Sequence, residues 1–508
     1  MSLMEERRGW FGHPRGLSTL FFTEMWERFS YYGMRAILLL FMTAPVAAGG
    51  LGWEAARAGP LYGLYTSMVY LASVPGGWIA DRFVGQRRAV LYGGVLIALG
   101  HLSLAFHDLK FFYLGLALIV AGTGLLKPNI STMVGSLYGE GDARRDAGFS
   151  IFYMGINLGA FIAPLVCGFL AQHAWFRGFL ERCGLRPESS WHWGFGAASV
   201  GMTLGVVQYL LGAGRLGGAG AAVPKAMDPE ARIRRNRSLR LGLTVLLGPV
   251  LLAAVMHAAG LMRITAGRLT GTVGVALLVV PLLYFGFFFS HKGWTPLEKR
   301  RLGAVFFLFL FAALFWSAFE QAGSSLNLFA ERFTRTEILG LAFPASWLQS
   351  VNSLFLIIFA PILAWLWVAL RDREPSSPAK FACGLFCAGV GFLLVAVAAG
   401  FTGSGGGRVS PLWLVALYFF HTVGELCLSP VGLSAMTKLA PARVAGQTMG
   451  LWFLALSAGN FIGGQVAGLF ETFPLPRLFG AVSAVTIACA LAAVALIRPI
   501  RRLMSGVN

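Results

Sequence analysis

The chain has 508 residues, of which 56% are hydrophobic and only 12% are charged, and its formal net charge is +19. Soluble domains carry roughly a quarter charged residues, so no globular core could bury this much apolar sequence and the excess must face lipid. The composition excludes an ordinary soluble enzyme, a disordered chain and a disulfide scaffold.

Long hydrophobic runs recur along the whole chain. Most exceed the roughly 20 residues that a helix needs to cross the hydrocarbon, and none alternates in polarity as β-barrel strands do. We expect spans at 17–46, 57–80, 88–107, 110–135, 147–172, 191–213, 239–260, 269–290, 301–331, 344–370, 379–401, 411–436, 445–470 and 477–498. The sequence therefore predicts an all-α integral membrane protein with fourteen transmembrane helices.

A stretch rich in Gly, Ala, Pro and Arg at 214–238 is the clearest break in composition. It predicts an N-terminal six-helix bundle at 1–213, a linker with two extra transmembrane helices at 214–299, and a C-terminal six-helix bundle at 300–508. Two pseudo-symmetric halves with a binding site between them are a recurring transporter design.

The basic residues are unevenly distributed between the two sides of the predicted membrane. Of the 41 Lys and Arg, 27 fall on the loops that share a side with both termini and 11 on the opposite loops. This bias predicts cytoplasmic termini and explains the high charge without a nucleic-acid partner. The basic stretch at 232–240 could in addition contact anionic lipid.

A few ionisable residues lie inside predicted spans, where charge is expensive and normally faces a cavity or a partner. The cations and carboxylates nearly balance, and a carboxylate whose partner moves away can carry a proton. This pattern predicts a proton-coupled site. The residues are Arg28, Arg35, Lys127, Glu24, Glu27, Glu320 and Glu425.

The first predicted helix carries most of these charges. At 3.6 residues per turn, Glu24, Arg28, Tyr31 and Arg35 share one stripe, with Glu27 and Tyr32 beside it. A polar face neutralised by pairing of Glu24 with Arg28 is the alternative. Because such a face would still need protein or water opposite it, we interpret the stripe as lining a pore.

Other helices place polar and aromatic residues one turn apart, such as Trp316 with Glu320 and Glu425 with Ser429. We interpret both carboxylates as functional. His421, one turn before Glu425, is interpreted as a packing histidine, with a proton relay as the alternative.

The remaining polar and aromatic candidates are ambiguous when taken alone. Asn157 and Asn352 could equally bridge helices, and Tyr70 and Trp452 are more typical of packing. Pro128, directly after Lys127, is expected to bend its helix.

Several motifs in order resemble the proton-dependent oligopeptide transporter (POT/PTR) family of the major facilitator superfamily, over residues 17 to 470. They are Glu24-xx-Glu27-Arg28-Phe29-x-Tyr31-Tyr32-Gly33, Gly77-Trp78-Ile79-Ala80-Asp81-Arg82 followed by Gly85 and Arg87-Arg88, Gly122-Thr123-Gly124-Leu125-Leu126-Lys127-Pro128-Asn129, Phe149-Ser150-Ile151-Phe152-Tyr153-Met154-Gly155-Ile156-Asn157, Phe315-Trp316, Phe319-Glu320-Gln321, Gly424-Glu425-Leu426-Cys427-Leu428-Ser429-Pro430 and Gly450-Leu451-Trp452-Phe453.

The resemblance implies two rocking six-helix bundles plus two inserted helices, as in prokaryotic members, and uptake of di- and tripeptides driven by inward proton flow. It places Arg28, Arg35 and Lys127 on the side of the peptide carboxylate. It places Glu425, Asn157 and Asn352 at the peptide amino group. The side-chain pockets would be formed by Tyr31, Tyr32, Tyr70, Trp316, Ser429 and Trp452.

The same resemblance implies proton coupling through Glu24, Glu27 and Glu320, with Arg28 beside them. We expect the pairs Arg35–Glu320 and Lys127–Glu425 to act as gate salt bridges that form when the outer side is closed. Some members carry an acidic residue just before the position of Glu320, whereas this chain has Phe319, so the sequence leaves proton stoichiometry and peptide length open.

Two other classes of function compete with peptide import. One is a major facilitator carrier of nitrate, a drug or a peptidomimetic. The other is a membrane-embedded enzyme or receptor, for which the sequence offers no nucleophile–base set and no metal-ligand spacing. We expect no enzyme activity, no cofactor or metal and no nucleic-acid partner, and a protein that functions as a monomer in the bacterial inner membrane.

Overall fold

The computed structural model describes residues 9–139, 141–221, 265–291, 293–338, 340–403, 407–441 and 444–506, with scattered residues between 236 and 261. The predicted span at 239–260 is described only in part, with helical residues at 240–242, 251–253 and 255–258, and most of the basic 232–240 stretch lies outside the described residues. Every other predicted span corresponds to a helix or to two consecutive helices.

The helices from the first part of the chain, called the N-terminal helices below, account for the first six predicted spans. They are α2 (Gly16–Thr43), α3 (Ala55–Leu71), α4 (Ser73–Ile79), α5 (Gln86–Leu104), α6 (Leu109–Ser136), α7 (Arg145–Gln172), α8 (Ala174–Arg182) and α9 (Ser190–Gly212). Consecutive α3 and α4 form one predicted span, and the short α8 lies in the connection between α7 and α9. Helix α2 packs against α7 and α9, and α5 packs against α6 and α9.

The helices from the second part, called the C-terminal helices below, follow one inserted helix, α11 (Ala266–Ser290). They are α12 (Pro296–Phe319), α13 (Ser325–Phe333), α14 (Ser350–Leu370), α15 (Ser377–Gly400), α16 (Leu412–Leu439), α17 (Ala445–Gly468) and α18 (Leu475–Met504). A small antiparallel hairpin follows α13, with β1 (Glu337–Ile338) paired to β2 (Leu341–Ala342). Helix α15 packs against α16 and α18, and α12 packs against α17.

The predicted single span at 301–331 is wrong in one respect, because the helix is broken in its middle. Helix α12 ends at Phe319, a 3₁₀ turn covers Glu320–Gly323, and α13 begins at Ser325 after Ser324, which has a non-helical backbone. Gly and Ser are weak helix formers, which favours a break at this point. Hydropathy alone does not detect such a break, because the flanking residues are apolar. By contrast, α6 continues as one helix through Pro128.

Among the described residues, nine helices are long and apolar enough to cross a membrane, judged by length and composition alone. They include α6, α14 and α18. Helix α2 is not among them because it carries Glu24, Glu27, Arg28 and Arg35 within its length. All four of these side chains are nevertheless buried. The protein must therefore cover the charged face of α2 with its own helices.

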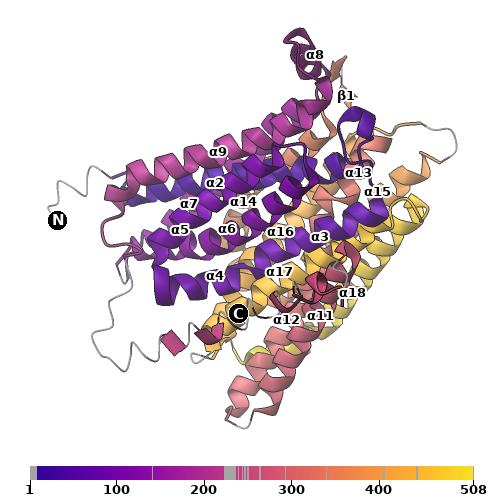
Figure 1. Ribbon diagram of the computed structural model, residues 1–508. Coiled ribbons are helices and arrows are strands. Elements are labelled where there is room, and N and C mark those ends of the chain that lie inside the picture. The colour runs from indigo at the N-terminus through magenta and orange to yellow at the C-terminus, as the bar shows by residue number, and fades with distance from the viewer. Residues whose placement is uncertain are drawn as a thin grey trace.

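The helices run side by side as one elongated bundle, with α8 and β1 at one end and the N-terminus toward the other (Figure 1). The two groups of helices meet where α3 packs against α17 and α7 packs against α14. At Gly63 and Gly464 the backbones touch, since a Cβ added to Gly464 would lie 2.3 Å from the Gly63 Cα. Close helix approach through small residues is typical of membrane helices.

Candidate functional site

A polar cavity of about 250 Å³ lies between the N-terminal and C-terminal helices. The N-terminal helices contribute Glu24, Arg28, Tyr32, Arg35, Tyr70, Lys127, Tyr153 and Asn157. The C-terminal helices contribute Trp316, Phe319, Glu320, Gln349, Asn352, Ser353, Tyr418, His421, Glu425 and Ser429. The cationic side chains of the cavity wall therefore come from the N-terminal helices, and the carboxylates of Glu320 and Glu425 come from the C-terminal part.

The charged face of α2 is held together by ion pairs within the helix. The Arg28 Nε lies 3.2 Å from Glu24 Oε1 and also donates to the carboxylate of Glu27. The Arg28 guanidinium additionally approaches the ring centroids of Tyr31 at 5.3 Å and Tyr32 at 6.0 Å. The predicted pairing of Glu24 with Arg28 is thus present, and it coexists with a position at the cavity wall.

Arg35 joins α2 to the break between α12 and α13. Its Nη2 lies 2.6 Å from Glu320 Oε2, and its Nε donates to Tyr62 Oη at 2.9 Å. The same Nη2 approaches the Glu320 carbonyl oxygen at 3.5 Å. Both charged side chains are about 95% buried. The ion pair expected between Arg35 and Glu320 is present in this conformation.

The second expected gate pair is not formed in this conformation. No ion pair within 4.0 Å joins Lys127 to Glu425 among the described residues. The Lys127 Nζ instead lies 3.9 Å from the ring centroid of Tyr70. An ammonium held over an aromatic face in a buried site is stabilised by the ring quadrupole, so Tyr70 takes the place expected for the carboxylate.

Several buried polar atoms around the cavity have no hydrogen-bond partner in the described part of the protein. They include Arg28 Nη2, Trp316 Nε1 and Glu425 Oε2. Two of these groups are donors from opposite walls, and the third is a carboxylate oxygen. Because an unsatisfied buried polar group is unfavourable, such atoms at a cavity wall indicate a site that binds a polar ligand.

The cavity is closed on the side away from the termini. All hydrogen bonds between the two groups of helices in the described residues lie at midspan or in that half. Examples are Asn327 Nδ2 to the Ala36 carbonyl at 2.8 Å, Ser350 Oγ to the Phe161 carbonyl at 2.8 Å, and Gln172 Nε2 to Glu331 Oε2 at 3.1 Å. The conformation is therefore sealed opposite the termini.

Three of the candidate residues do not line the cavity. Glu27 and Tyr31 are fully buried beside Arg28, so they contact the site through that cation. Trp452 packs against α16, where a Cβ added to Gly432 would lie 2.3 Å from its ring. Helical spacing had placed Glu27 and Tyr31 only on the approximate face, whereas Trp452, typical of packing when taken alone, was placed at a pocket by the family resemblance.

The amide candidates have their own hydrogen bonds. Asn157 Nδ2 donates to the Tyr153 carbonyl at 2.9 Å, and Asn352 Nδ2 donates to Thr422 Oγ1 at 3.0 Å. Both residues also line the cavity. Asn352 thus bridges α14 to α16 and borders the site, so the two interpretations left open by the sequence are compatible.

Sequence reasoning missed four residues that complete the site. Gln349, Ser353 and Tyr418 line the cavity, and Tyr62 holds Arg35. Gln349 and Ser353 are one helical turn apart, and that polar spacing at the start of an apolar helix was a usable signal. Tyr62 gave no signal, because its partner is distant in sequence.

Among the described residues, no group of three or more His, Cys, Asp or Glu side chains is arranged to hold a metal ion. His421 is buried between the rings of Phe319 and Phe392, with centroid distances of 5.7 and 5.5 Å. This environment is that of a packing histidine that also borders the cavity.

A multi-pass helical membrane protein with an enclosed site of opposed charges between two helical groups has the architecture of a membrane transporter. A family model described as the POT family matches residues 87–233 and 266–484. The chain belongs to this family.

Relatives of known name support the same placement. The peptide transporter YePEPT of Yersinia enterocolitica is 42% identical over 98% of this chain and 97% of the relative. The di-/tripeptide transporter of Lactococcus lactis subsp. cremoris is 36% identical over the full length of both chains. A crystal structure of a peptide transporter POT in complex with sulfate has a TM-score of 0.88 and 43% identity, covering 98% of this chain and 97% of that one.

Proposed function

We propose that the protein is a proton-coupled symporter that imports di- and tripeptides by alternating access. The observation that carries the proposal is the cavity itself, in which cations of the N-terminal helices face Glu320 and Glu425 of the C-terminal helices. A peptide is a zwitterion, so opposed positive and negative walls at low dielectric match its two ends. The names of the relatives point to the same class of substrate.

Each end of the peptide has a set of side chains of the right chemistry. We propose that Arg28 and Lys127, together with Arg35 once released, bind the carboxylate. Glu425, Asn157 and Asn352 bind the amino group. The unpartnered Arg28 Nη2 and Glu425 Oε2 support this orientation, because they are a free donor and a free acceptor on opposite walls.

The aromatic and hydroxyl side chains would bind the rest of the peptide. Tyr32, Tyr70, Trp316 and Ser429 border the cavity and are proposed to contact peptide side chains. Tyr31 and Trp452 lie behind the wall, and we propose a supporting role for them.

Proton coupling would act through the pair that holds the outer side closed. Protonation of Glu320 removes one charge of the Arg35–Glu320 pair and weakens the link between α2 and the α12–α13 break. A protonation equilibrium drives transport only when it favours one conformation over the other. The carboxylates of Glu24 and Glu27, both bound to Arg28, are proposed to hold or relay the proton on the opposite wall.

The conformational change would be a rocking of residues 1–213 against 300–508, with 214–299 as a linker that carries the inserted helices. We propose that the chain works as a monomer in the bacterial inner membrane with both termini in the cytoplasm. The uneven distribution of Lys and Arg supports this orientation.

Uptake into proteoliposomes tests the proposal. Purified protein is reconstituted, an inward proton gradient is imposed, and accumulation of labelled dialanine is measured with and without unlabelled di- and tripeptides. We expect accumulation above equilibrium that is abolished by a protonophore and reduced by competing peptides. Transport of nitrate or a drug with no effect of peptides would overturn the substrate assignment.

A further inference from the structure

The N-terminal helices carry a second and larger hollow, separate from the central cavity. Its volume is about 880 Å³, and its lining residues come from α2, α5, α7 and α9 and from the connections beside them. None of them lines the cavity between the two groups of helices. The proposed transport cycle therefore gives this hollow no role.

The hollow opens toward the lipid. Val200 is 61% exposed, Leu204 is 46% exposed and Val166 is 38% exposed, and all three lie in membrane-spanning helices. Small residues make the surface concave, since a Cβ added to Gly196 would meet only the Ala105 Cβ at 4.0 Å. An open apolar hollow at membrane depth is in contact with acyl chains.

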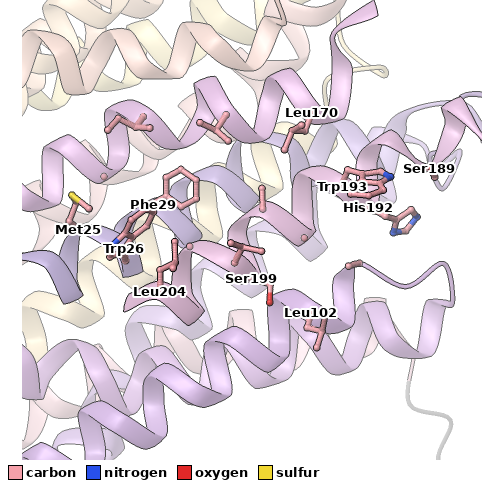
Figure 2. A pocket seen from close by; sticks show the side chains of 18 of the residues that line it. Met25, Trp26, Phe29, Leu102, Leu170, Ser189, His192, Trp193, Ser199 and Leu204 are labelled. Atoms are coloured by element: carbon pink, nitrogen blue, oxygen red, sulfur yellow. The ribbon is translucent and has the colours of Figure 1, made fainter. Parts of the chain in front are cut away.

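The hollow flanks α9 on both sides. Leu170 of α7 lies on one side of the helix and Leu102 of α5 on the other, whereas Ser189, His192 and Trp193 gather at one end (Figure 2). At 1.5 Å per residue, α9 extends about 16 Å from Trp193 to Leu204. That length is close to one leaflet of a hydrocarbon core roughly 30 Å thick. The shape thus suits two chains of one leaflet, one on each side of α9.

A polar pocket of about 460 Å³ continues the hollow at its outer end. His107, Ser189 and His192 border both spaces. The polar pocket is also lined by Arg186, which has no carboxylate within ion-pairing distance in the described part of the chain. It therefore offers a cation to an anionic group.

The same pocket also offers partners of the opposite sign. Asp108 and Glu188 line it, and Asp108 Oδ1 also accepts from the Lys110 N–H at the start of α6 at 2.7 Å. Arg186 attracts negative charge, whereas the two carboxylates attract a cation. The headgroup of an anionic lipid would be attracted by Arg186 but repelled by Asp108 and Glu188. A headgroup that carries both a phosphate and an ammonium group matches both.

We propose that this hollow binds one diacyl phospholipid with an aminoalkyl phosphate headgroup, from the leaflet opposite the termini. One acyl chain lies between α9 and α5 and the other between α9 and α7. The phosphate contacts Arg186 and the ammonium contacts Asp108 and Glu188. The inference depends on the helices spanning the membrane, and it is independent of the transported substrate.

Native mass spectrometry of delipidated protein tests the proposal with synthetic palmitoyl-oleoyl phosphatidylethanolamine and its phosphatidylglycerol counterpart. We expect one phosphatidylethanolamine retained per chain, in preference to phosphatidylglycerol. Gly196→Phe fills the hollow and should lower retention by about tenfold. Gly480→Phe is the matched control, because nothing lies within 4 Å of a Cβ added at that position on α18, and it should retain lipid normally.

Two further measurements separate the headgroup from the chains and do not depend on the folding of Gly196→Phe. Glu188→Gln should reduce the preference for phosphatidylethanolamine, because it removes a carboxylate proposed to contact the ammonium, whereas Arg186→Gln should lower retention of both lipids, which share the phosphate. A phosphatidylethanolamine with a photoreactive diazirine in one acyl chain should crosslink the wild-type protein within α5, α7 or α9. Equal retention of both lipids overturns the headgroup assignment. Unchanged retention in Gly196→Phe, or crosslinks spread evenly over α14 and α18, overturns the site.

Discussion

Arg35 and Glu320 form a buried ion pair of 2.6 Å that joins α2 to the break between α12 and α13. Because the helix is interrupted at Glu320–Gly323, the backbone carbonyl of Glu320 also lies near the Arg35 guanidinium. The Tyr62 hydroxyl accepts from the other side of Arg35. The Arg35 guanidinium is thus held by both the side chain and the backbone of Glu320. Protonation of Glu320 would neutralise the side-chain half of this contact. Three of the predictions below follow from this arrangement.

Replacing Glu320 by Gln should abolish proton-driven accumulation while sparing exchange. The amide cannot take up a proton, so peptide binding is kept and the coupling is lost. Accumulation and counterflow of labelled dialanine are measured in the same proteoliposomes. Glu337→Gln is the control, because this exposed carboxylate lies on β1 outside the cavity. If Glu320→Gln still concentrates peptide against its gradient, the assignment of this carboxylate is wrong.

Removing one partner of the pair should destabilise the protein more than removing both. Arg35→Gln leaves Glu320 buried without its cation, and breaking a buried pair in this way costs about 3–5 kcal/mol. The double substitution Arg35→Gln with Glu320→Gln should recover part of this loss. Thermal unfolding of the wild-type protein, the two single variants and the double variant in detergent gives the coupling free energy between the two side chains. Additive losses would show that the two side chains do not depend on each other for stability.

Gly323→Ala should open the outer side. A Cβ at this position would lie 1.9 Å from the Tyr62 hydroxyl and 2.8 Å from Arg35 Nε, so the contact between the two groups of helices has to shift. Electron spin resonance between labels at Phe179 on α8 and Glu337 on β1 should report a larger distance, in a background with Cys183 and Cys383 replaced by Ser. Gly400→Ala is the control, since its Cβ would meet nothing within 4 Å. An unchanged distance distribution in Gly323→Ala would contradict a gate at Arg35.

The charged face of α2 shows what the sequence could predict. Intramembrane charge has few explanations, so the convergence of Arg28, Arg35, Glu320 and Glu425 on one cavity followed from the energy of charge in lipid and from helical spacing. The hydrophobic runs likewise predicted the helices, with ends within a few residues of those observed.

The details that failed depend on tertiary contacts. Glu320, in the break between α12 and α13, pairs with Arg35 of α2, and Lys127 lies against Tyr70 of α3 instead of pairing with Glu425 of α16. Trp452 faces Gly432 because a glycine on the neighbouring α16 makes room for its ring. Periodicity along one helix assigns a face but does not identify the neighbour of that face.

The outer contact at Glu471 should be insensitive to pH in the range where proton gradients operate. Burial alone would raise the pKa of Glu471, but the hydrogen bonds from Arg332, at 2.6 Å, and from the Ala55 N–H hold that pKa below its ordinary value. A carboxylate with a lowered pKa stabilises the fold above its ordinary pKa and loses that contribution only as the pH falls through the lowered value.

The stabilising effect of Glu471 should therefore be complete at neutral pH and disappear only in strong acid. Glu471→Gln should lower the melting temperature at pH 7, and this effect should shrink as the pH falls below the ordinary pKa of a glutamate. The pH profile of peptide uptake between about pH 5 and 8 should keep its shape in this variant, since this range lies above the ordinary pKa of a glutamate. A shifted uptake profile would make Glu471 part of the proton-coupling machinery instead.

Substrate chemistry separates the negative wall from the positive wall. Glu425→Gln should weaken binding of dialanine strongly, because the ammonium group loses its carboxylate partner, yet it should leave binding of N-acetyl-alanyl-alanine nearly unchanged. A lost charge-assisted hydrogen bond is worth about 1.5–3 kcal/mol, or roughly a 10- to 150-fold change in affinity.

Lys127→Gln should show the reverse selectivity, losing dialanine but sparing dialanine amide. Affinities are measured by competition in the wild-type protein, in both variants and in Glu337→Gln. If Glu425→Gln weakens the acetylated and free peptides equally, this carboxylate shapes the cavity without binding the amino group.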